Sequence, residues 1–145
     1  MWQLYRSTIS QYPKIPLPEE RRLIALAQEG SQKSTEEIIL RHIGFVIFRI
    51  HKRAFPEFLR RFGEDLLSNS IPVLYQKIKT YDLSYCDKHG SPKPVKFASY
   101  IWKRIDGLIL DSLKKELREE GRVWAVRLRN ERYASCIIEE EPEEV

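Results

Sequence analysis

Aromatic and basic side chains are interleaved between residues 93 and 115, a composition suited to binding a single nucleic-acid strand. The aromatic residues are Phe97, Tyr100 and Trp102, and the basic ones are Lys93, Lys96, Lys103, Arg104, Lys114 and Lys115. Unpaired bases stack on aromatic faces with about 1–3 kcal/mol each, while cations hold the phosphates. The stretch therefore predicts a site for unpaired bases. The alternative is that Phe97 and Tyr100 only cover a hydrophobic core.

Helical spacing divides this stretch into two faces, because side chains three or four residues apart lie on one side of a helix. The predicted exposed face holds Tyr100, Lys103, Arg104, Gly107 and Asp111. The predicted core face holds Ile101, Ile105, Leu108 and Ser112. Such a helix would offer a ring and several cations to the same ligand.

Metal and catalytic chemistry find little support in the sequence. Cys86 and His89 have the C-x-x-H spacing of half a zinc site, but zinc needs four ligands and no second pair is near. Cys136 and His51 would join them only through folding. No glycine-rich phosphate loop, G-x-S-x-G elbow or H-E-x-x-H motif occurs. We therefore expect no catalytic residue, metal or cofactor, and no enzymatic activity.

Net charge favours a polyanionic partner. The chain carries 25 Lys and Arg against 21 Asp and Glu, a formal charge of +4. Five glutamates lie within residues 139–145, so residues 1–138 alone carry 4 plus 5, or +9. A body this basic attracts nucleic acid because each neutralised phosphate releases counterions, although a merely solvated basic surface is the alternative. The acidic tail is expected to be disordered.

Helix-end signals locate the first two helices that must position the aromatic and basic stretch. Pro18 opens a helix that Gly30 ends. A capping box at Ser34 and Glu37 opens a second helix, which ends before Pro56. Besides its apolar face, this second helix is predicted to carry a basic face of Arg41, Arg49, Lys52 and Arg53.

The remaining pattern is also helical. A third helix is predicted from about residue 64 to 82, where Pro72 either kinks it or follows a new helix start capped by Ser70. Residues 83–96 contain one glycine and two prolines and predict a loop. A helix over residues 97–120 follows, ended by Gly121, with a short basic helix at 122–133. The predicted fold is all-α, a compact bundle of four to five helices.

Length and segment composition place the chain among small cytoplasmic proteins. Its 145 residues indicate one domain with a single core. The longest apolar run, residues 43–48, is too short to span a membrane, and the first ten residues show no secretory signal. Two cysteines suggest no disulfide framework.

Residues 97–114, FASYIWKRIDGLILDSLK, resemble the promoter-melting helix of bacterial RNA polymerase sigma factors of the sigma-seventy family, especially the flagellar and sporulation types. That family's pattern is close to F-x-T-Y-A-x-x-R-I-R-G-x-x-x-D-x-L-R. The sequence matches it at Phe97, Tyr100, Arg104, Ile105, Gly107, Asp111 and Leu113, with Ser99 and Lys114 as close substitutes. Residues 63–82, GEDLLSNSIPVLYQKIKTYD, align without gaps to the family's D-L-I-Q-E-G-x-I-G-L-x-x-A-x-x-x-F-D. The resemblance covers about residues 16–120, including LPEERRLIALAQEGS and RHIGFVIFRIHKR.

The resemblance implies a region-2-like domain that binds core polymerase and opens the promoter at its minus-ten element. Tyr100 would stack on the flipped adenine, with Phe97 beside that pocket. Contacts to the non-template strand or to phosphates at the melting fork are implied for Lys96, Lys103, Arg104 and Lys114. Trp102 is a further DNA-binding candidate. The polymerase would perform all covalent chemistry.

Polymerase docking is implied for the third helix, on the coiled coil of the polymerase's largest catalytic subunit. The candidate docking residues are Asp65, Ser68, Asn69, Pro72 and Tyr75. Ser68 and Asn69 replace the family's Gln-Glu, and Pro72 interrupts the helical pattern, so docking is expected to be weakened or altered. Asp106 replaces an arginine and is expected to subtract charge from the DNA face.

Three functions stay open at this point. The first is a sigma factor made of an N-terminal extension (1–15), the sigma-like domain (16–120), a basic helical extension (121–138) and the acidic tail (139–145). No segment resembling the reader of the minus-thirty-five element is found, so such a factor would be a fragment, a divergent minimal factor or one half of a two-protein sigma. The last of these predicts a partner protein that carries the missing reader. The second is a degenerate sigma-like module that binds polymerase or an anti-sigma factor without melting DNA. The third is an unrelated helical DNA-binding domain.

Overall fold

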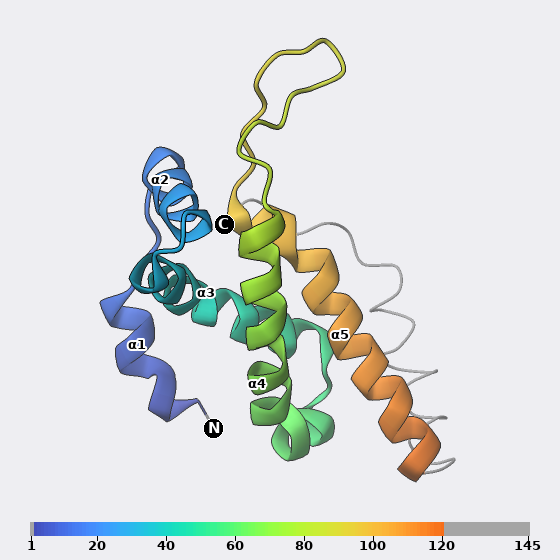
Figure 1. Cartoon of the computed structure of the whole chain (residues 1–145). Helices are drawn as coiled ribbons and strands as arrows, with labels where there is room; N and C mark the ends of the chain where they lie inside the picture. The colour runs from blue at the N-terminus through green and yellow to red at the C-terminus, as the bar shows by residue number, and fades with distance from the viewer. Residues whose placement is uncertain (1, 121–145) are drawn as a thin grey trace.

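The computed structural model describes residues 2–120, which form five α-helices and one short 3-10 helix. In chain order these are η1 (Gln3–Tyr5), α1 (Arg6–Gln11), α2 (Leu17–Gln28), α3 (Gln32–Arg53), α4 (Pro56–Thr80) and α5 (Phe97–Glu120) (Figure 1). The all-α fold predicted from periodicity is confirmed. No helix within this range combines the length and hydrophobicity needed to cross a membrane. The helix end predicted at Gly121, the basic extension and the acidic tail lie outside the described residues.

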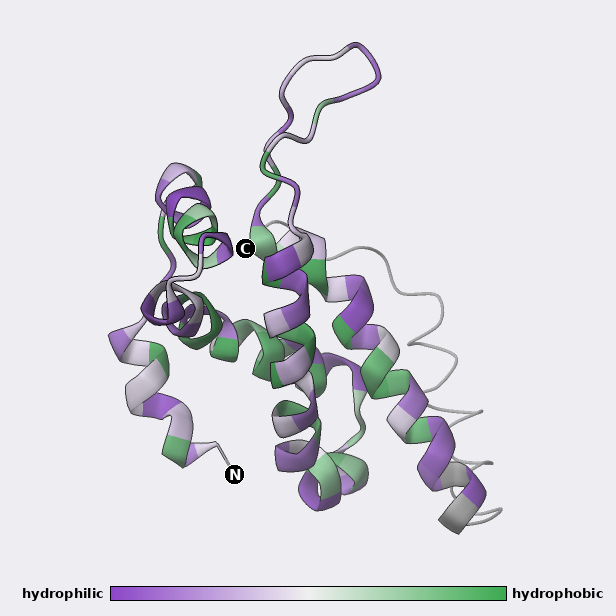
Figure 2. Cartoon of the chain, in the orientation of Figure 1, coloured by the Kyte–Doolittle hydropathy of each residue, from purple (hydrophilic) through white to green (hydrophobic). Residues whose placement is uncertain are grey.

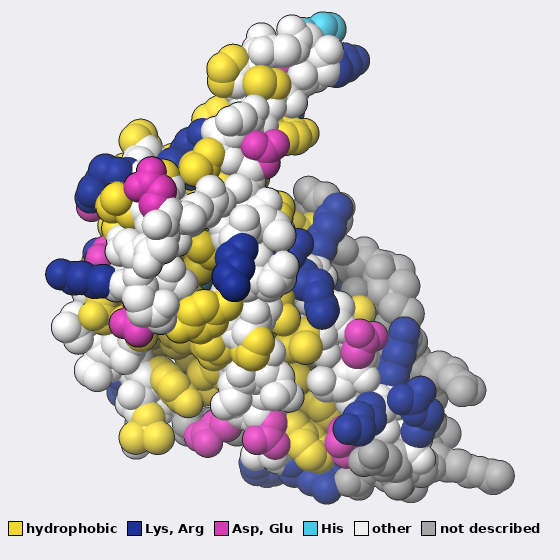
Figure 3. Space-filling model, in the orientation of Figure 1, with side chains coloured by type: hydrophobic (Ala, Val, Ile, Leu, Met, Phe, Trp, Pro, Cys, Tyr) yellow, Lys and Arg dark blue, Asp and Glu magenta, His cyan; other side chains and the backbone are white. Residues whose placement is uncertain are grey.

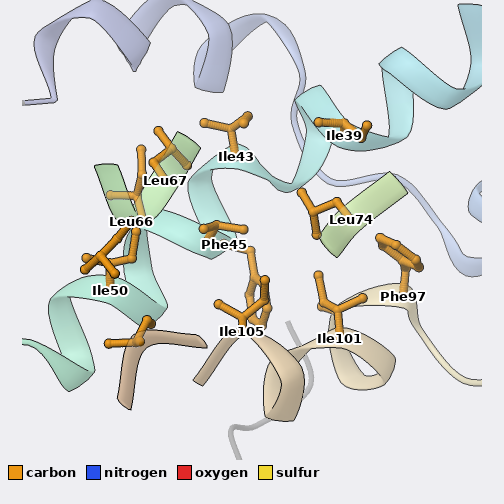
Figure 4. Packing of buried hydrophobic residues seen from close by; sticks show 14 of the residues in the cluster. Ile39, Ile43, Phe45, Ile50, Leu66, Leu67, Leu74, Phe97, Ile101 and Ile105 are labelled. Atoms are coloured by element: carbon orange, nitrogen blue, oxygen red, sulfur yellow. The ribbon is translucent and has the colours of Figure 1, made fainter. Parts of the chain in front are cut away.

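Helix α3 lies at the centre of the bundle, and α1, α2, α4 and α5 all pack on it. Helices α4 and α5 also pack on one another (Figure 1). Hydrophobic side chains from these helices meet between them, as Figure 4 shows for Ile43, Leu74 and Ile101. Along α5, hydrophobic and hydrophilic residues alternate as expected for a helix with one buried side (Figure 2). Burying each large aliphatic side chain stabilises the fold by roughly 1.5–3 kcal/mol.

Local turn chemistry sets the end of α2 and the start of α3. Gly30 has a φ of +108°, a left-handed conformation that favours glycine, and it follows α2 as predicted. Helix α3 begins at Gln32, with Ser31 as its N-cap, and the Ser31 hydroxyl oxygen accepts the Ser34 N–H at 3.2 Å. The predicted capping box at Ser34 and Glu37 is therefore wrong, because Ser34 already lies inside the helix.

Helix α4 is longer than predicted, since it begins at Pro56 and runs through Pro72 without interruption. The alternative in which Ser70 caps a new helix is wrong. Ser70 instead donates its hydroxyl to the Leu67 carbonyl at 2.6 Å. Pro72 has no N–H for the carbonyl four residues earlier, but both Pro72 and Ser68 are exposed. An exposed carbonyl can bond to solvent in place of the missing N–H, which explains why a proline is tolerated at this exposed position of the helix.

The N-terminal extension packs against α3. Ile9 of α1 lies against Gly44, where an added Cβ would come within 3.5 Å of the Ile9 side chain. The Trp2 indole N–H donates to Nε2 of His51. Arg41 donates to the backbone carbonyl of Pro13 at 2.6 Å. These contacts join residues 2–13 to the bundle that the sequence assigned to residues 16–120.

His42 is a buried titratable group on α3. Its Nδ1 donates to the Ile38 carbonyl at 2.7 Å, and its Nε2 lies 3.8 Å from a carboxylate oxygen of Glu20. Burial lowers the pKa of His42 below its usual 6.5, although the Ile38 hydrogen bond and the Glu20 carboxylate each raise it; the Arg41 charge also lowers it. The imidazole is therefore neutral at pH 7.

We expect the free energy of unfolding to fall as the pH drops below about 6.5. There the unfolded chain takes up a proton at His42 and the folded chain does not, so this group costs about 1.4 kcal/mol per pH unit until the folded-state pKa is reached. Urea denaturation at pH 7.5, 6.5 and 5.5 measures the slope. His42→Gln, which keeps an N–H donor, should flatten it; an unaltered slope in that variant would assign the dependence to other groups.

Candidate nucleic-acid interface

The exposed side of α5 carries a basic stripe, defined here as Tyr100, Lys103, Arg104, Lys114, Lys115 and Arg118. Together with Gly107 and Asp111, which lie between Arg104 and Lys114, these residues step by three or four along the chain, so they follow one side of the helix. The five cationic side chains are exposed and Tyr100 is half-buried. Figure 3 shows Lys and Arg side chains gathered over α5. Asp111 is the acidic residue that lies within the stripe.

The buried side of α5 is rotated relative to the predicted core face. Ile101 and Ile105 are fully buried as predicted, and Ile109 and Leu113 continue the buried row. The predicted members Leu108 and Ser112 are partly exposed. The difference arises because α5 packs on both α3 and α4, so two neighbours together decide which side of the helix is buried.

Tyr100 is held by the end of α4. Its hydroxyl donates to the Thr80 carbonyl at 3.0 Å and lies 2.8 Å from the Thr80 hydroxyl. The Lys77 ammonium lies 4.7 Å from the centre of the ring. Tyr81 meets the ring at 88°, with ring centres 5.5 Å apart. The ring is therefore fixed before any ligand arrives, which lowers the entropic cost of binding.

Helix α2 supports the junction between α4 and α5. Gln28 donates to the carbonyls of Ile78 at 3.0 Å and Tyr81 at 2.7 Å, at the end of α4 where carbonyls lack helical partners. Arg21 donates to the Tyr81 hydroxyl at 3.1 Å. That hydroxyl donates in turn to the Val95 carbonyl. The chain leaving α4 and the chain entering α5 are thereby tied together.

Phe97, predicted to lie beside the base pocket, is fully buried and offers no face to a base. Its ring packs against His42 with centres 4.8 Å apart. Its N–H donates to a carboxylate oxygen of Glu20 at 2.6 Å. A carboxylate at this position satisfies the first turn of α5 and complements the helix dipole. Phe97 anchors the helix that carries Tyr100, and Glu20 is a positioning residue that sequence reasoning missed.

Trp102 lies on the far side of α5 from Tyr100, because two residues turn a helix by about 200°. Its half-buried ring has the Arg49 guanidinium carbon 5.2 Å from its centre and the Lys103 ammonium 5.5 Å away. The ring thus contacts an α3 side chain and shares no surface with Tyr100. Through Lys103 the Trp102 ring adjoins the edge of the basic stripe, but on the side of α5 opposite to Tyr100.

A buried charge cluster joins α3 to α5. The Asp106 carboxylate accepts Nε–H of Arg49 at 2.9 Å and Nε–H of Arg53 at 2.7 Å, and Nη2 of Arg49 also bonds to it. The exposed fractions of Arg49, Arg53 and Asp106 are 0%, 3% and 6%. Two expectations are therefore wrong: Arg49 and Arg53 are not on an exposed basic face, and Asp106 does not lie on the DNA face. One carboxylate thus bonds to two guanidinium groups in the interior.

The predicted loop between α4 and α5 projects from the bundle as a narrow finger (Figure 1). An isolated bridge joins Cys86 to Pro92, and the Asp87 carboxylate accepts the His89 N–H at 2.8 Å. Cys86 is exposed and not in a disulfide, and Lys96 at the base of the finger is half-buried. Within residues 2–120 no three His, Cys, Asp or Glu side chains gather closely enough to hold a metal ion.

The residues predicted to bind polymerase follow one side of α4. Asp65, Ser68, Asn69 and Pro72 are exposed, and Tyr75 is half-buried. A groove of about 270 Å³ runs beside them between α4 and α5, lined by Phe58, Phe62, Asp65, Leu66, Ser68, Asn69, Ser112, Lys115 and Glu116. Aromatic and aliphatic side chains bordered by polar ones resemble the composition of protein-binding surfaces.

Comparisons with known proteins add no relative: no family model matches the chain, and neither curated proteins nor solved structures gave a match.

Proposed function

We propose that the protein is a sigma factor, or a sigma-factor-like subunit, that binds core RNA polymerase and recognises and melts the promoter minus-ten element. The observation that carries the proposal is Tyr100 at the start of the basic stripe, where a fixed aromatic ring adjoins a row of exposed cations. This combination suits an unpaired base and the phosphates beside it. The resemblance of residues 97–114 to the promoter-melting helix supports the same assignment.

The proposed mechanism is capture of an unpaired base. A base that leaves the duplex loses a few kcal/mol of stacking and pairing, and stacking on an aromatic ring returns about 1–3 kcal/mol. Tyr100 supplies that ring, while Lys103 and Arg104 hold the backbone on either side of it. Selectivity for melted DNA follows, because a base inside the duplex has no access to the ring. The polymerase performs the covalent chemistry, and the complex belongs in the cytoplasm with the nucleoid.

Binding measurements test this function. We would follow the fluorescence anisotropy of a labelled single strand containing TATAAT, its scrambled version and the duplex, each with and without core polymerase. Preference for the TATAAT strand that depends on core supports a sigma factor. Equal affinity for duplex and single strand would instead indicate an unrelated DNA-binding domain.

Docking on polymerase is assigned to the exposed side of α4, with the coiled coil of the largest catalytic subunit as the partner. We expect Asn69→Arg to weaken binding to core at least tenfold, because a long cation would occupy the rim of the groove beside α5. Gln32→Arg, at an exposed position at the start of α3, adds the same single charge and should leave binding unchanged. Biolayer interferometry with immobilised core measures both variants. Equal binding by the two variants would show that core polymerase does not dock on this side of α4.

A second function remains supported by one feature of α4. Pro72, Ser68 and Asn69 depart from the family's pattern on the side assigned to polymerase, as expected for a degenerate module that binds polymerase or an anti-sigma factor without melting DNA. Asp106 lends this function no support, because its charge is used in the interior. Binding to core without any preference for the TATAAT strand would favour the degenerate module.

A further inference from the structure

The ring of Tyr100 is already in contact with a cation before any nucleic acid binds. The Lys77 ammonium lies 4.7 Å from the ring centre, within the range of a cation–π interaction. Lys77 is half-buried, whereas Lys79, in the same last turn of α4, is exposed. The ammonium of Lys77 thus lies where a stacked base would lie, because a base also approaches a ring from its face.

We infer that Lys77 caps the stacking face of Tyr100 in the free protein and that an incoming base must displace it. This inference rests on the proposed function, since it concerns the same ring. Tyr100 does not turn away to accommodate both groups, because its hydroxyl is bonded to Thr80 and its ring is packed against Tyr81. The Lys77 side chain, whose aliphatic stem is flexible, is therefore the group that must move when a base stacks.

The cap makes Lys77 a residue that determines selectivity. A phosphate can bind to the basic stripe without contacting the Tyr100 ring, so its binding does not require the contact between Lys77 and Tyr100 to break. A base that stacks on Tyr100 must first break the cation–π contact, which lowers the affinity contributed by stacking. Lys77 consequently disfavours weakly stacking or partly paired bases at this ring.

A paired set of oligonucleotides separates the ring from the phosphates. Twelve-nucleotide oligodeoxyadenylate and a fully abasic strand of equal length carry the same phosphates. The dissociation constant of the abasic strand divided by that of oligodeoxyadenylate therefore reports stacking alone, and this quotient is the ratio used below. Binding is measured by anisotropy at low salt, where attraction between phosphates and basic side chains is strong enough to hold even the abasic strand. We expect Lys77→Ala to raise the ratio about two- to fivefold, which corresponds to an exposed cation–π contact. Lys79→Ala removes the same charge and should leave the ratio unchanged.

Nuclear magnetic resonance tests the cap in the free protein. Methylene protons of Lys77 next to the ammonium should be shifted upfield by the Tyr100 ring and return toward ordinary values in Tyr100→Ala. The same return is expected on saturation with oligodeoxyadenylate but not with the abasic strand. Ordinary Lys77 shifts in the free protein would overturn the cap.

Failure of the Lys77 cap and failure of the base-stacking function give different results. If Tyr100→Ala abolishes the preference for oligodeoxyadenylate while Lys77→Ala leaves or lowers it, the cap is overturned and the base-stacking function stands. If Tyr100→Ala leaves the preference unchanged, or no strand binds even with core polymerase present, the base-stacking function fails and displacement of Lys77 fails with it.

Discussion

Asp106→Asn should destabilise the protein by about 3–5 kcal/mol, the cost of leaving buried charge uncompensated. The asparagine keeps the size of the side chain and removes the negative charge that faces Arg49 and Arg53. Nη1 of Arg49 is itself buried without a hydrogen-bond partner, so Arg49 in particular depends on the Asp106 carboxylate. Chemical denaturation monitored by circular dichroism measures the change in the free energy of unfolding. A loss of this size is a large fraction of the stability of a small domain.

Two further variants identify the cause of that loss. Asp111→Asn removes a carboxylate from the exposed side of the same helix and should alter stability by no more than about 0.5 kcal/mol. In an Arg49→Met background, Asp106→Asn should cost less than in the natural chain, because one of the two cations is already absent. Equal costs in both backgrounds would show that packing of the Asp106 side chain, and not its charge, stabilises the fold.

Tyr100→Ala should lower affinity for the TATAAT strand in the presence of core polymerase by about 5- to 150-fold, the equivalent of 1–3 kcal/mol of lost stacking. The reason is that Tyr100 is the aromatic ring of the basic stripe, whereas Phe97 is buried and Trp102 contacts Arg49 on α3. Neither Phe97 nor Trp102 can therefore replace Tyr100 as the ring on which a base stacks. Anisotropy with the labelled single strand measures the change, after circular dichroism has established that the variant is folded.

Tyr100→Phe and Lys103→Ala are the matched controls for that measurement. The phenylalanine keeps the ring and loses only the bond to Thr80, so affinity should stay within a fewfold of the natural chain. Lys103→Ala should weaken all strands alike and reduce the slope of affinity against salt by about one. A Tyr100→Ala variant with the Lys103→Ala pattern would mean that Tyr100 acts in folding or phosphate binding and not in stacking.

Local sequence patterns predicted the helical fold and much of the exposed side of α5. Gly30 ends a helix because a left-handed residue favours glycine, and the spacing of Tyr100, Lys103 and Arg104 follows directly from the pitch of a helix. Such features depend on neighbours within a few residues, so a single sequence contains them. The N-cap residue of α3 and the effect of Pro72 on α4 were harder to predict, because more than one residue in each stretch has a side chain suited to an N-cap.

Tertiary structure alone decided which charges are buried and which ring is available. Arg49 and Asp106 are 57 residues apart and Glu20 and Phe97 are 77 apart, so no local spacing links either pair. A charged residue looks solvent-facing in a helical pattern until a second helix brings an opposite charge to it. The same holds for Tyr100, whose ring meets Lys77 only because α4 and α5 pack together. Sequence therefore determined the helices and the approximate course of their apolar sides, and packing between helices determined which side of each is buried and which charges lie within it.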